Sequence, residues 1–189
     1  MSLSVLALGA NLPFAGRSAE ANLRLVMKEL EGLEKCRVLA SSRLWRSAPV
    51  MAEGPRFFNA CSLMDTSLEP LELLKELLSL ESHWGRIRGS KTGQALAAAR
   101  TLDLDLIWME GRTSDGARLS LPHPRASGRA FVLGPLLDLD PWLGERLQLP
   151  HPVTGKPCGS QALWLQLPEV ARLECQPMAE PIDPMEKAA

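Results

Sequence analysis

The segment TLDLDLIWM, residues 101–109, alternates between leucine and aspartate over most of its length. Successive side chains of a β-strand point to opposite faces, so a period of two predicts a strand with one buried and one polar face. The buried face would carry Leu102, Leu104 and Leu106, and the polar face Asp103 and Asp105. We therefore expect this segment to lie in a sheet whose leucine side is covered.

The segments around this strand predict a sheet flanked by helices. Apolar residues recur along the chain with a period of two, or at the i, i+3, i+4 spacing of a helix. The predicted strands are 3–10, 37–46, 56–66 and 118–122, and the predicted helices are 19–35, 69–84, one within 123–139, and 160–169. The first strand is almost continuously apolar, so we expect it in the centre of the sheet. Because helices alternate with hairpins, the pattern favours an α+β fold, with a three-layer, ferredoxin-like arrangement of an antiparallel sheet between helices.

The composition is that of an ordinary globular protein. With 189 residues, of which 46% are hydrophobic and 23% charged, the chain predicts one domain, residues 1–176, and a disordered tail, residues 177–189. The net charge of −1 excludes an overall electrostatic field that would attract the protein to nucleic acid or to a membrane, so we expect neither as a partner. The four cysteines have no CxxC spacing, and no apolar run is long enough for a membrane helix. Both features predict a cytoplasmic protein with reduced thiols.

Asp103 and Asp105 are the strongest candidates for chemistry. Residues i and i+2 of a strand lie on one face, about 7 Å apart at Cα, and two carboxylates there repel each other unless a cation lies between them. Magnesium suits such a pair because it prefers one or two carboxylates together with substrate phosphates, and two ions would form a phosphoryl-transfer site. The alternative is an edge strand whose polar face is only solvated.

Arginines gather around this strand, although the net charge of the chain is nearly zero. They are Arg86, Arg88, Arg100, Arg118, Arg125 and Arg129. A guanidinium pairs with phosphate oxygens two at a time, so acidic metal ligands beside arginines suit a nucleoside triphosphate. Each arginine alone could be a solvated surface residue, and the loop residue His123 could be solvated or could reach a phosphate. Upstream, an aromatic ring beside Asn59 could stack on and bond a flat heterocycle, with core packing as the alternative.

Seven segments, taken in order, carry a resemblance to a known family. They are ALGANL (7–12), SAPV (47–50), FFNA (57–60), LESHWGRIR (80–88), RTLDLDLI (100–107), LPHPR (121–125) and RAFVLGPLLDLDP (129–141). Together they resemble 6-hydroxymethyl-7,8-dihydropterin pyrophosphokinase of folate biosynthesis over residues 3–165. The resemblance implies an ATP-dependent pyrophosphokinase, in which the pterin hydroxyl attacks the β-phosphorus of ATP, AMP leaves, and the pyrophosphoryl group is transferred.

The resemblance also implies roles for the matching residues. Asp103 and Asp105 would hold two magnesium ions on the triphosphate, and Arg86 and Arg100 would be catalytic. Further ATP contacts would come from Arg88, Arg118, His123 and Arg129. The pterin would lie between Phe57 and Phe131, with Asn59 bonding its polar edge and backbone groups of Ser47 and Val50 completing the pocket. We expect a monomer whose partners are these two small molecules.

Residues 89–99 depart from the family pattern. Ala97, Ala98 and Ala99 stand where the family carries Trp-Gly-Pro, and the segment is longer than the family's mobile lid. Lys91 is the only charged residue within it and is a candidate phosphate contact, with a solvated lysine as the alternative. Two other functions stay open at this point: a pterin- or ATP-binding protein of the same fold with little turnover, and another metal-dependent phosphotransferase that shares only the DxD strand.

Overall fold

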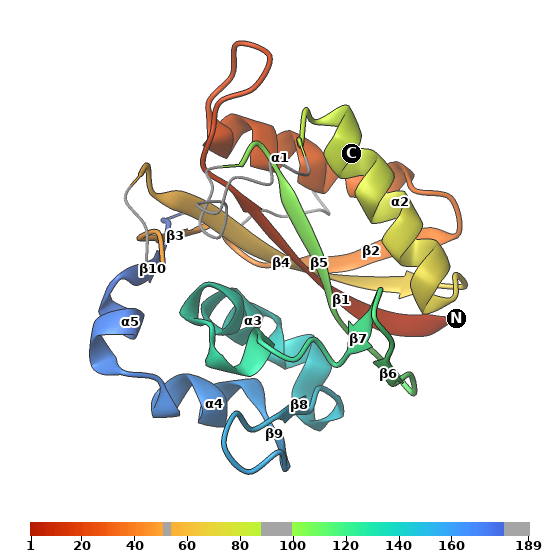
Figure 1. Ribbon diagram of the computed structural model, residues 1–189, viewed down its shortest axis with the longest axis vertical. Helices are drawn as coiled ribbons and strands as arrows, with labels where there is room; N and C mark the ends of the chain where they lie inside the picture. Colours follow the sequence, from red (N-terminus) through yellow and green to blue (C-terminus); the bar gives the residue numbers. More distant parts are fainter. Residues whose placement is uncertain (51–53, 88–99, 180–189) are drawn as a thin grey trace.

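The structure is a computed structural model that describes residues 1–50, 54–87 and 100–179. Its main sheet is built around β1 (Ser2–Ala10), which pairs antiparallel with a strand on each side (Figure 1). These neighbours are β4 (Phe57–Thr66) and β5 (Asp103–Met109). Beyond them, β4 pairs with β2 (Cys36–Ser41) and β3 (Trp45–Ser47), and β3 pairs with β10 (Cys175–Pro177). The central position expected for the first strand is confirmed.

Helices cover both faces of this sheet (Figure 1). One layer consists of α1 (Ala19–Glu29) and α2 (Pro70–His83), and the other of α3 (Ala130–Leu143) with α4 (Ser160–Gln166) and α5 (Glu169–Leu173) beside it. Two hairpins complete the described elements, β6 (Ser114–Asp115) with β7 (Ser120–Leu121) and β8 (Leu149–Pro150) with β9 (Pro157–Cys158). The antiparallel sheet between helical layers confirms the α+β fold class.

The alternation of side chains along β1 explains why both faces need a helical layer. Leu6 and Leu8 belong to a buried cluster with α1 and α2, whereas Val5 and Ala7 belong to a second cluster with α3. The leucines of 101–109 join the first cluster, as their spacing predicts. Helix α1 begins where it is expected, because the Oγ of Ser18 accepts a hydrogen bond from the backbone N–H of residue 21.

Some predicted elements are shorter than their sequence patterns suggest. The segment 37–46 is not one strand, because the Oγ of Ser42 accepts from the backbone N–H of Cys61 at 2.9 Å and interrupts the ladder between β2 and β3. Helix α1 ends at Glu29 and is followed by a 3-10 turn, Leu30–Gly32, rather than continuing to Lys35. Lys35 has a φ of +62°, which an α-helix does not accommodate. The return strand predicted at 118–122 shortens to β7.

The C-terminal part of the described chain returns to the sheet. Strand β10 includes Pro177, and the backbone N–H of Met178 donates to the carbonyl of Leu44 at 2.7 Å. Regular pairing therefore continues into the first residues of the segment expected to be a tail, while residues 180–189 lie outside the described residues. Within the described ranges, no helix is both long enough and apolar enough to cross a membrane.

Candidate functional site

Acidic residues of β5 and a polar residue of β4 lie on the same face of the sheet. The register places Asp103 opposite Gly9 on β1, and Gly9 opposite Asn59 on β4. Directly opposite residues of antiparallel strands point to one side, so these three form a row across three strands. Asp105 lies opposite Ala7, whose side chain packs in the cluster that contains α3. The row is therefore on the α3 side of the sheet, and Gly9 leaves its middle without a side chain.

Two arginines converge on Asp103. The Nη1 of Arg86 donates to the Oδ1 of Asp103 at 2.7 Å and to the carbonyl oxygen of Leu102 at 2.5 Å. The Nη1 of Arg100 donates to the other carboxylate oxygen, Oδ2. The structure thus brings together three of the four predicted catalytic residues, which come from the end of α2, the segment before β5 and β5 itself.

The environment of Asp105 is different from that of Asp103. None of the described residues donates a hydrogen bond to its carboxylate, and its nearest ion pair is with the Nη1 of Arg129, at 3.8 Å. Burial raises the pKa of Asp105 above its ordinary value of 3.8, and the neighbouring charge of Asp103 raises it further. A half-buried carboxylate that accepts no hydrogen bond from the described residues is a suitable ligand for a cation.

His123 lies beside this carboxylate. Its backbone N–H donates to the carbonyl of Ile107 at 2.7 Å, which fixes the loop against β5. Its Nδ1 accepts from the backbone N–H of Arg125 at 3.2 Å, so a neutral ring carries its proton on Nε2. Burial lowers the pKa of His123 below its ordinary value, although the charge of Asp105 opposes the shift. A neutral imidazole with a free Nε2–H can donate a hydrogen bond to an anion.

Three of the residues predicted to hold the pterin, Ser47, Phe57 and Asn59, lie together at the other end of the row. Asn59 is 3% exposed, and its Nδ2 donates to the Oγ of Ser47 at 3.0 Å. Ser47 lies opposite Phe57 on β4, so the ring and the amide share a neighbourhood on one face. Phe131, in the first turn of α3, is half-buried, and the guanidinium of Arg129 lies 5.3 Å from its ring centroid. Val50 is 61% exposed at the edge of the described segment.

Two predicted phosphate contacts are not among these groups. Arg118 is exposed on the turn between β6 and β7, and none of the described hydrogen bonds or ion pairs joins it to the other site residues. Arg88 lies outside the described residues, as do Lys91 and the whole segment 89–99 that was expected to form a lid.

Two buried polar residues that the sequence patterns did not single out support the site. Glu81 is fully buried, its Oε1 accepts from the backbone N–H of Leu104 at 2.8 Å, and it lies 3.9 Å from Arg86. Asn11 accepts from the backbone N–H of Arg100 at 2.7 Å through its Oδ1. The signal for Glu81 was its position four residues after Leu77, on the apolar stripe of α2, where an acidic residue needs a buried partner.

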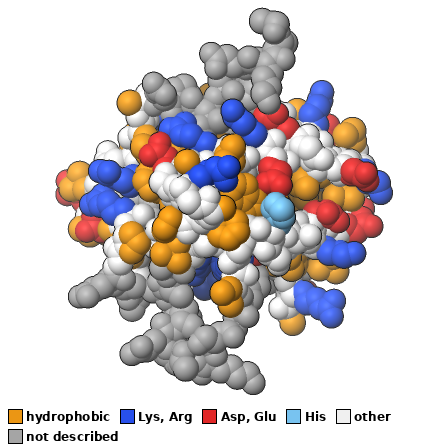
Figure 2. Space-filling view, turned by 90° about the horizontal axis from the view of Figure 1, so that it is seen from above, with side chains coloured by type: hydrophobic (Ala, Val, Ile, Leu, Met, Phe, Trp, Pro, Cys, Tyr) orange, Lys and Arg blue, Asp and Glu red, His pale blue; other side chains and the backbone are white. Residues whose placement is uncertain are grey.

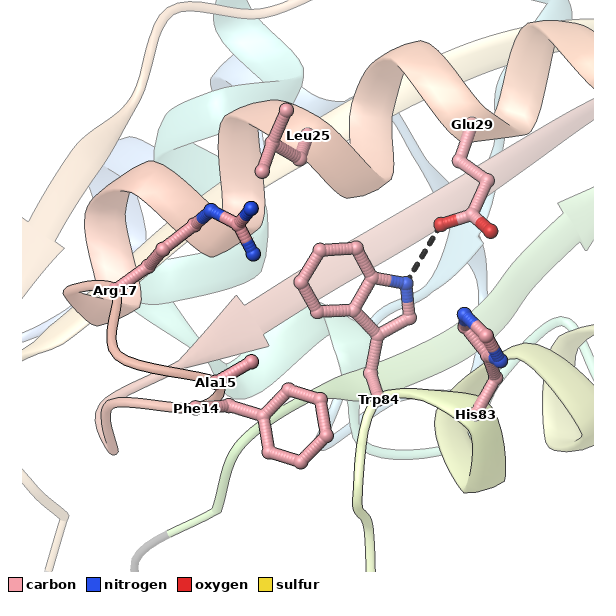
Figure 3. Close-up of a pocket in the computed structure, with 7 residues that line it drawn as sticks. All are labelled: Phe14, Ala15, Arg17, Leu25, Glu29, His83 and Trp84. Carbon is pink, nitrogen blue, oxygen red and sulfur yellow. Dashed lines mark hydrogen bonds between the residues drawn. The ribbon is translucent and has the colours of Figure 1, made fainter.

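The structure also contains a cavity of about 440 Å³ on the opposite side of the sheet, between the 11–17 loop, α1 and the end of α2 (Figure 3). Its lining includes Phe14, Arg17, Leu25, Glu29, His83 and Trp84, none of which is a predicted site residue. On the face drawn in Figure 2, basic and acidic side chains are interspersed and neither sign of charge dominates.

Comparison with known proteins assigns the family. The family model described as 7,8-dihydro-6-hydroxymethylpterin-pyrophosphokinase matches residues 5–141. A 2-amino-4-hydroxy-6-hydroxymethyldihydropteridine pyrophosphokinase of Pseudomonas aeruginosa is 38% identical over 136 residues, which cover 71% of this chain and 78% of the relative. The protein of the same name from Synechocystis is 40% identical over 126 residues, covering 66% of this chain and 62% of the relative.

A solved structure gives the same fold. The Plasmodium falciparum HPPK-DHPS crystal structure with pteroate superposes with a TM-score of 0.59 at 12% sequence identity. The match covers 87% of this chain and 44% of that protein, so this chain spans less than half of the Plasmodium protein. The matched region of the family model contains every site residue that the structure brings together. This chain therefore belongs to the 7,8-dihydro-6-hydroxymethylpterin-pyrophosphokinase family.

Proposed function

We propose that this chain transfers the pyrophosphoryl group of ATP to the hydroxyl of 6-hydroxymethyl-7,8-dihydropterin in folate biosynthesis, with the described row of residues as its site. The observation that carries the site is the row Asn59, Gly9 and Asp103 across three adjacent strands. It offers an amide for a heterocycle at one end, carboxylates and arginines for a metal-bound triphosphate at the other, and open backbone between them. We further propose that one chain suffices, because the row and the arginines that converge on it all belong to one chain.

The reaction needs positioning more than covalent catalysis. The hydroxyl oxygen forms a bond to the β-phosphorus while the bond from that phosphorus to the oxygen bridging to the α-phosphorus breaks. AMP leaves with that oxygen and its electron pair, and the hydroxyl proton passes to water. Such in-line displacements are accelerated mainly by alignment and by fixed positive charge around the phosphates.

Magnesium fits the acidic end of the row. Asp105 offers oxygens that accept no hydrogen bond within the described structure, and carboxylates are hard oxygen ligands of the kind this ion prefers. We propose that Asp103 and Asp105 hold two such ions, which would neutralise the triphosphate and polarise its phosphoryl oxygens. A carboxylate pair alone is a weak site, since no cluster of three or more acidic, histidine or cysteine ligands exists in the described part of the chain. The ions would therefore arrive together with the nucleotide.

The arginines and His123 would bind the phosphates around this centre. Arg86 and Arg100 both donate to Asp103, which supports a role for their guanidinium groups beside the transferred phosphoryl groups. His123 would donate from Nε2, and Arg129 would contact the nucleotide from the start of α3. We propose that Arg88 and Arg118 add further contacts to the nucleotide.

The pterin would occupy the other end of the row. Phe57 and Phe131 would stack on its ring, and Asn59 would bond its polar edge. The donation from Asn59 to Ser47 fixes the amide, so little side-chain freedom is lost when the ligand binds. Backbone groups of Ser47 and Val50 would complete the pocket.

Incubation of the chain with ATP, magnesium and 6-hydroxymethyl-7,8-dihydropterin, followed by separation of the nucleotides, tests the proposal. We expect AMP to form only when the pterin is present. Release of ADP or of inorganic pyrophosphate, or tight binding of both ligands without AMP, would contradict it. Asp115→Ala, on the exposed β6 strand, is the matched control for Asp103→Ala and should retain activity.

A further inference from the structure

The end of α2 sets the direction of Arg86. The backbone N–H groups of Gly85 and Arg86 donate to the carbonyls of Ser82 and Glu81, at 3.1 and 2.9 Å, and close the helix. Gly85 has a φ of +73°, which turns the chain back toward β5. Arg86 then reaches Asp103, and its side chain is 14% exposed. The position of this guanidinium therefore depends on where residues 84 and 85 are held.

Trp84 is held by a hydrogen bond to another helix. Its Nε1 donates to the Oε2 of Glu29, at the end of α1, at 2.6 Å (Figure 3). Trp84 is 8% exposed and belongs to the buried cluster, whereas Glu29 is exposed. A charge-assisted hydrogen bond of this kind is stronger than a neutral one and fixes the indole in one orientation.

Phe14 packs against the same helix end from the 11–17 loop. Its ring centroid lies 6.1 Å from that of Trp84, and a Cβ placed on Gly85 would lie 2.3 Å from its Cε2. The loop that carries Phe14 also binds the second catalytic arginine, because the backbone N–H groups of Asn11 and Leu12 both donate to the carbonyl of Arg100. The 11–17 loop therefore contacts both the end of α2 that precedes Arg86 and the backbone of Arg100.

We propose that Trp84 and Glu29 are positioning residues for pyrophosphoryl transfer, and that they act by holding Arg86 against Asp103. The inference rests on the proposed function. Neither side chain lies on the substrate face of the sheet, since both line the cavity on the opposite side. Their effect passes through Gly85 and one turn of backbone to the guanidinium. Preorganised charge stabilises a transition state only when it is held in place before the reaction, so a small displacement of Arg86 slows transfer more than it weakens binding.

Substitutions at this contact test the proposal. Trp84→Phe keeps an aromatic ring but removes the indole N–H, and Glu29→Ala removes the acceptor. We expect each to lower kcat by about three- to tenfold, the range that loss of one hydrogen bond produces, while KM for both substrates changes less than twofold. Glu29→Gln keeps an acceptor oxygen and should stay near the unmodified rate. Glu31→Ala, two residues further on and exposed, is the matched control and should change neither constant.

A double-mutant cycle separates positioning from a general loss of stability. In an Arg86→Ala background, measured under single-turnover conditions with enzyme in excess, Trp84→Phe should have no further effect on the rate. In an Arg129→Ala background it should keep its full effect. Equal factors in both backgrounds, or a lower melting temperature with an unchanged rate per folded molecule, would overturn the inference. An unmodified chain that forms no AMP would instead overturn the proposed function.

Discussion

Asp103 and Asp105 are equivalent in the sequence pattern and different in the structure. The pattern predicts two like charges that repel each other. On that basis, removal of either carboxylate would keep or raise the free energy of unfolding. In the structure, Asp103 accepts from Arg86 and Arg100, whereas Asp105 accepts no hydrogen bond within the described residues. We therefore expect the two carboxylates to have opposite effects on the free energy of unfolding, a difference that the sequence pattern does not contain.

For Asp103→Ala we expect loss of both activity and stability. Two guanidinium groups would lose a shared carboxylate, and breaking hydrogen bonds to charged groups costs about 1–3 kcal/mol. AMP formation should fall about a hundredfold or more, because transition-state charge stabilisation worth several kcal/mol would be lost. Urea unfolding and a nucleotide assay on the same preparation measure the two effects. A variant as stable as the unmodified chain would show that the arginines find other partners.

For Asp105→Asn we expect loss of activity but a gain in stability at neutral pH. The folded-state pKa of Asp105 lies above its ordinary value of 3.8, so the folded chain binds a proton more tightly than the unfolded chain. Stability is therefore lost as pH rises from that value through the raised pKa, and asparagine removes this loss. The melting temperature of the variant, relative to the unmodified chain in metal-free buffer, should rise between pH 4 and pH 7. A difference that shrinks over this range would contradict the assignment.

At the scale of elements, the sequence predicts what depends on local periodicity. The strands β1, β4 and β5 and the helix α2 follow from the spacing of their apolar residues. The interruption after Ser41 depends on a hydrogen bond from Cys61 to Ser42, nineteen residues away, and no local pattern contains it. Glu81 stands on the apolar stripe of α2, which the local pattern does contain, but its partner Leu104 lies on another element and only the fold identifies it.

Gly85→Ala should destabilise the chain through both its backbone and its surroundings. A side chain at a φ of +73° costs about 1–2 kcal/mol, and its Cβ would overlap the Phe14 ring, where overpacking adds about 1–3 kcal/mol. Phe14→Ala, added to Gly85→Ala, should recover only the stability that is lost through overpacking. Denaturant unfolding of the two variants measures the difference, and Gly32→Ala, whose Cβ would meet nothing within 4 Å, is the control. Equal destabilisation with and without Phe14 would show that the ring moves aside.

At the scale of the whole molecule, the site exists only after distant segments meet. Asn59, Gly9 and Asp103 are spread over almost 100 residues, yet the antiparallel register places them in one row. The resemblance to a family names Asn59 and Asp103 from their motifs and gives no role to Gly9. The residues alone supply as candidates the carboxylate pair, the arginines around it and an aromatic ring beside Asn59. The proposed division of the row into a heterocycle end and a phosphate end depends on this register of the assembled sheet.

This division predicts that the two ligands can be weakened separately. Asn59→Ala should reduce the affinity for the pterin about ten- to a hundredfold, because unpaired polar atoms of the ligand cost about 1–3 kcal/mol, and should leave the affinity for ATP nearly unchanged. Arg100→Ala should do the reverse, because its guanidinium lies at the Asp103 end of the row. Calorimetric titration of each variant with each ligand, with magnesium present for ATP, gives the four affinities. The arrangement requires the two losses to fall on different ligands, since Gly9 lies between Asn59 and Asp103, the carboxylate to which Arg100 donates. If Asn59→Ala weakened both ligands equally, its amide would be supporting the sheet rather than lining a pterin pocket.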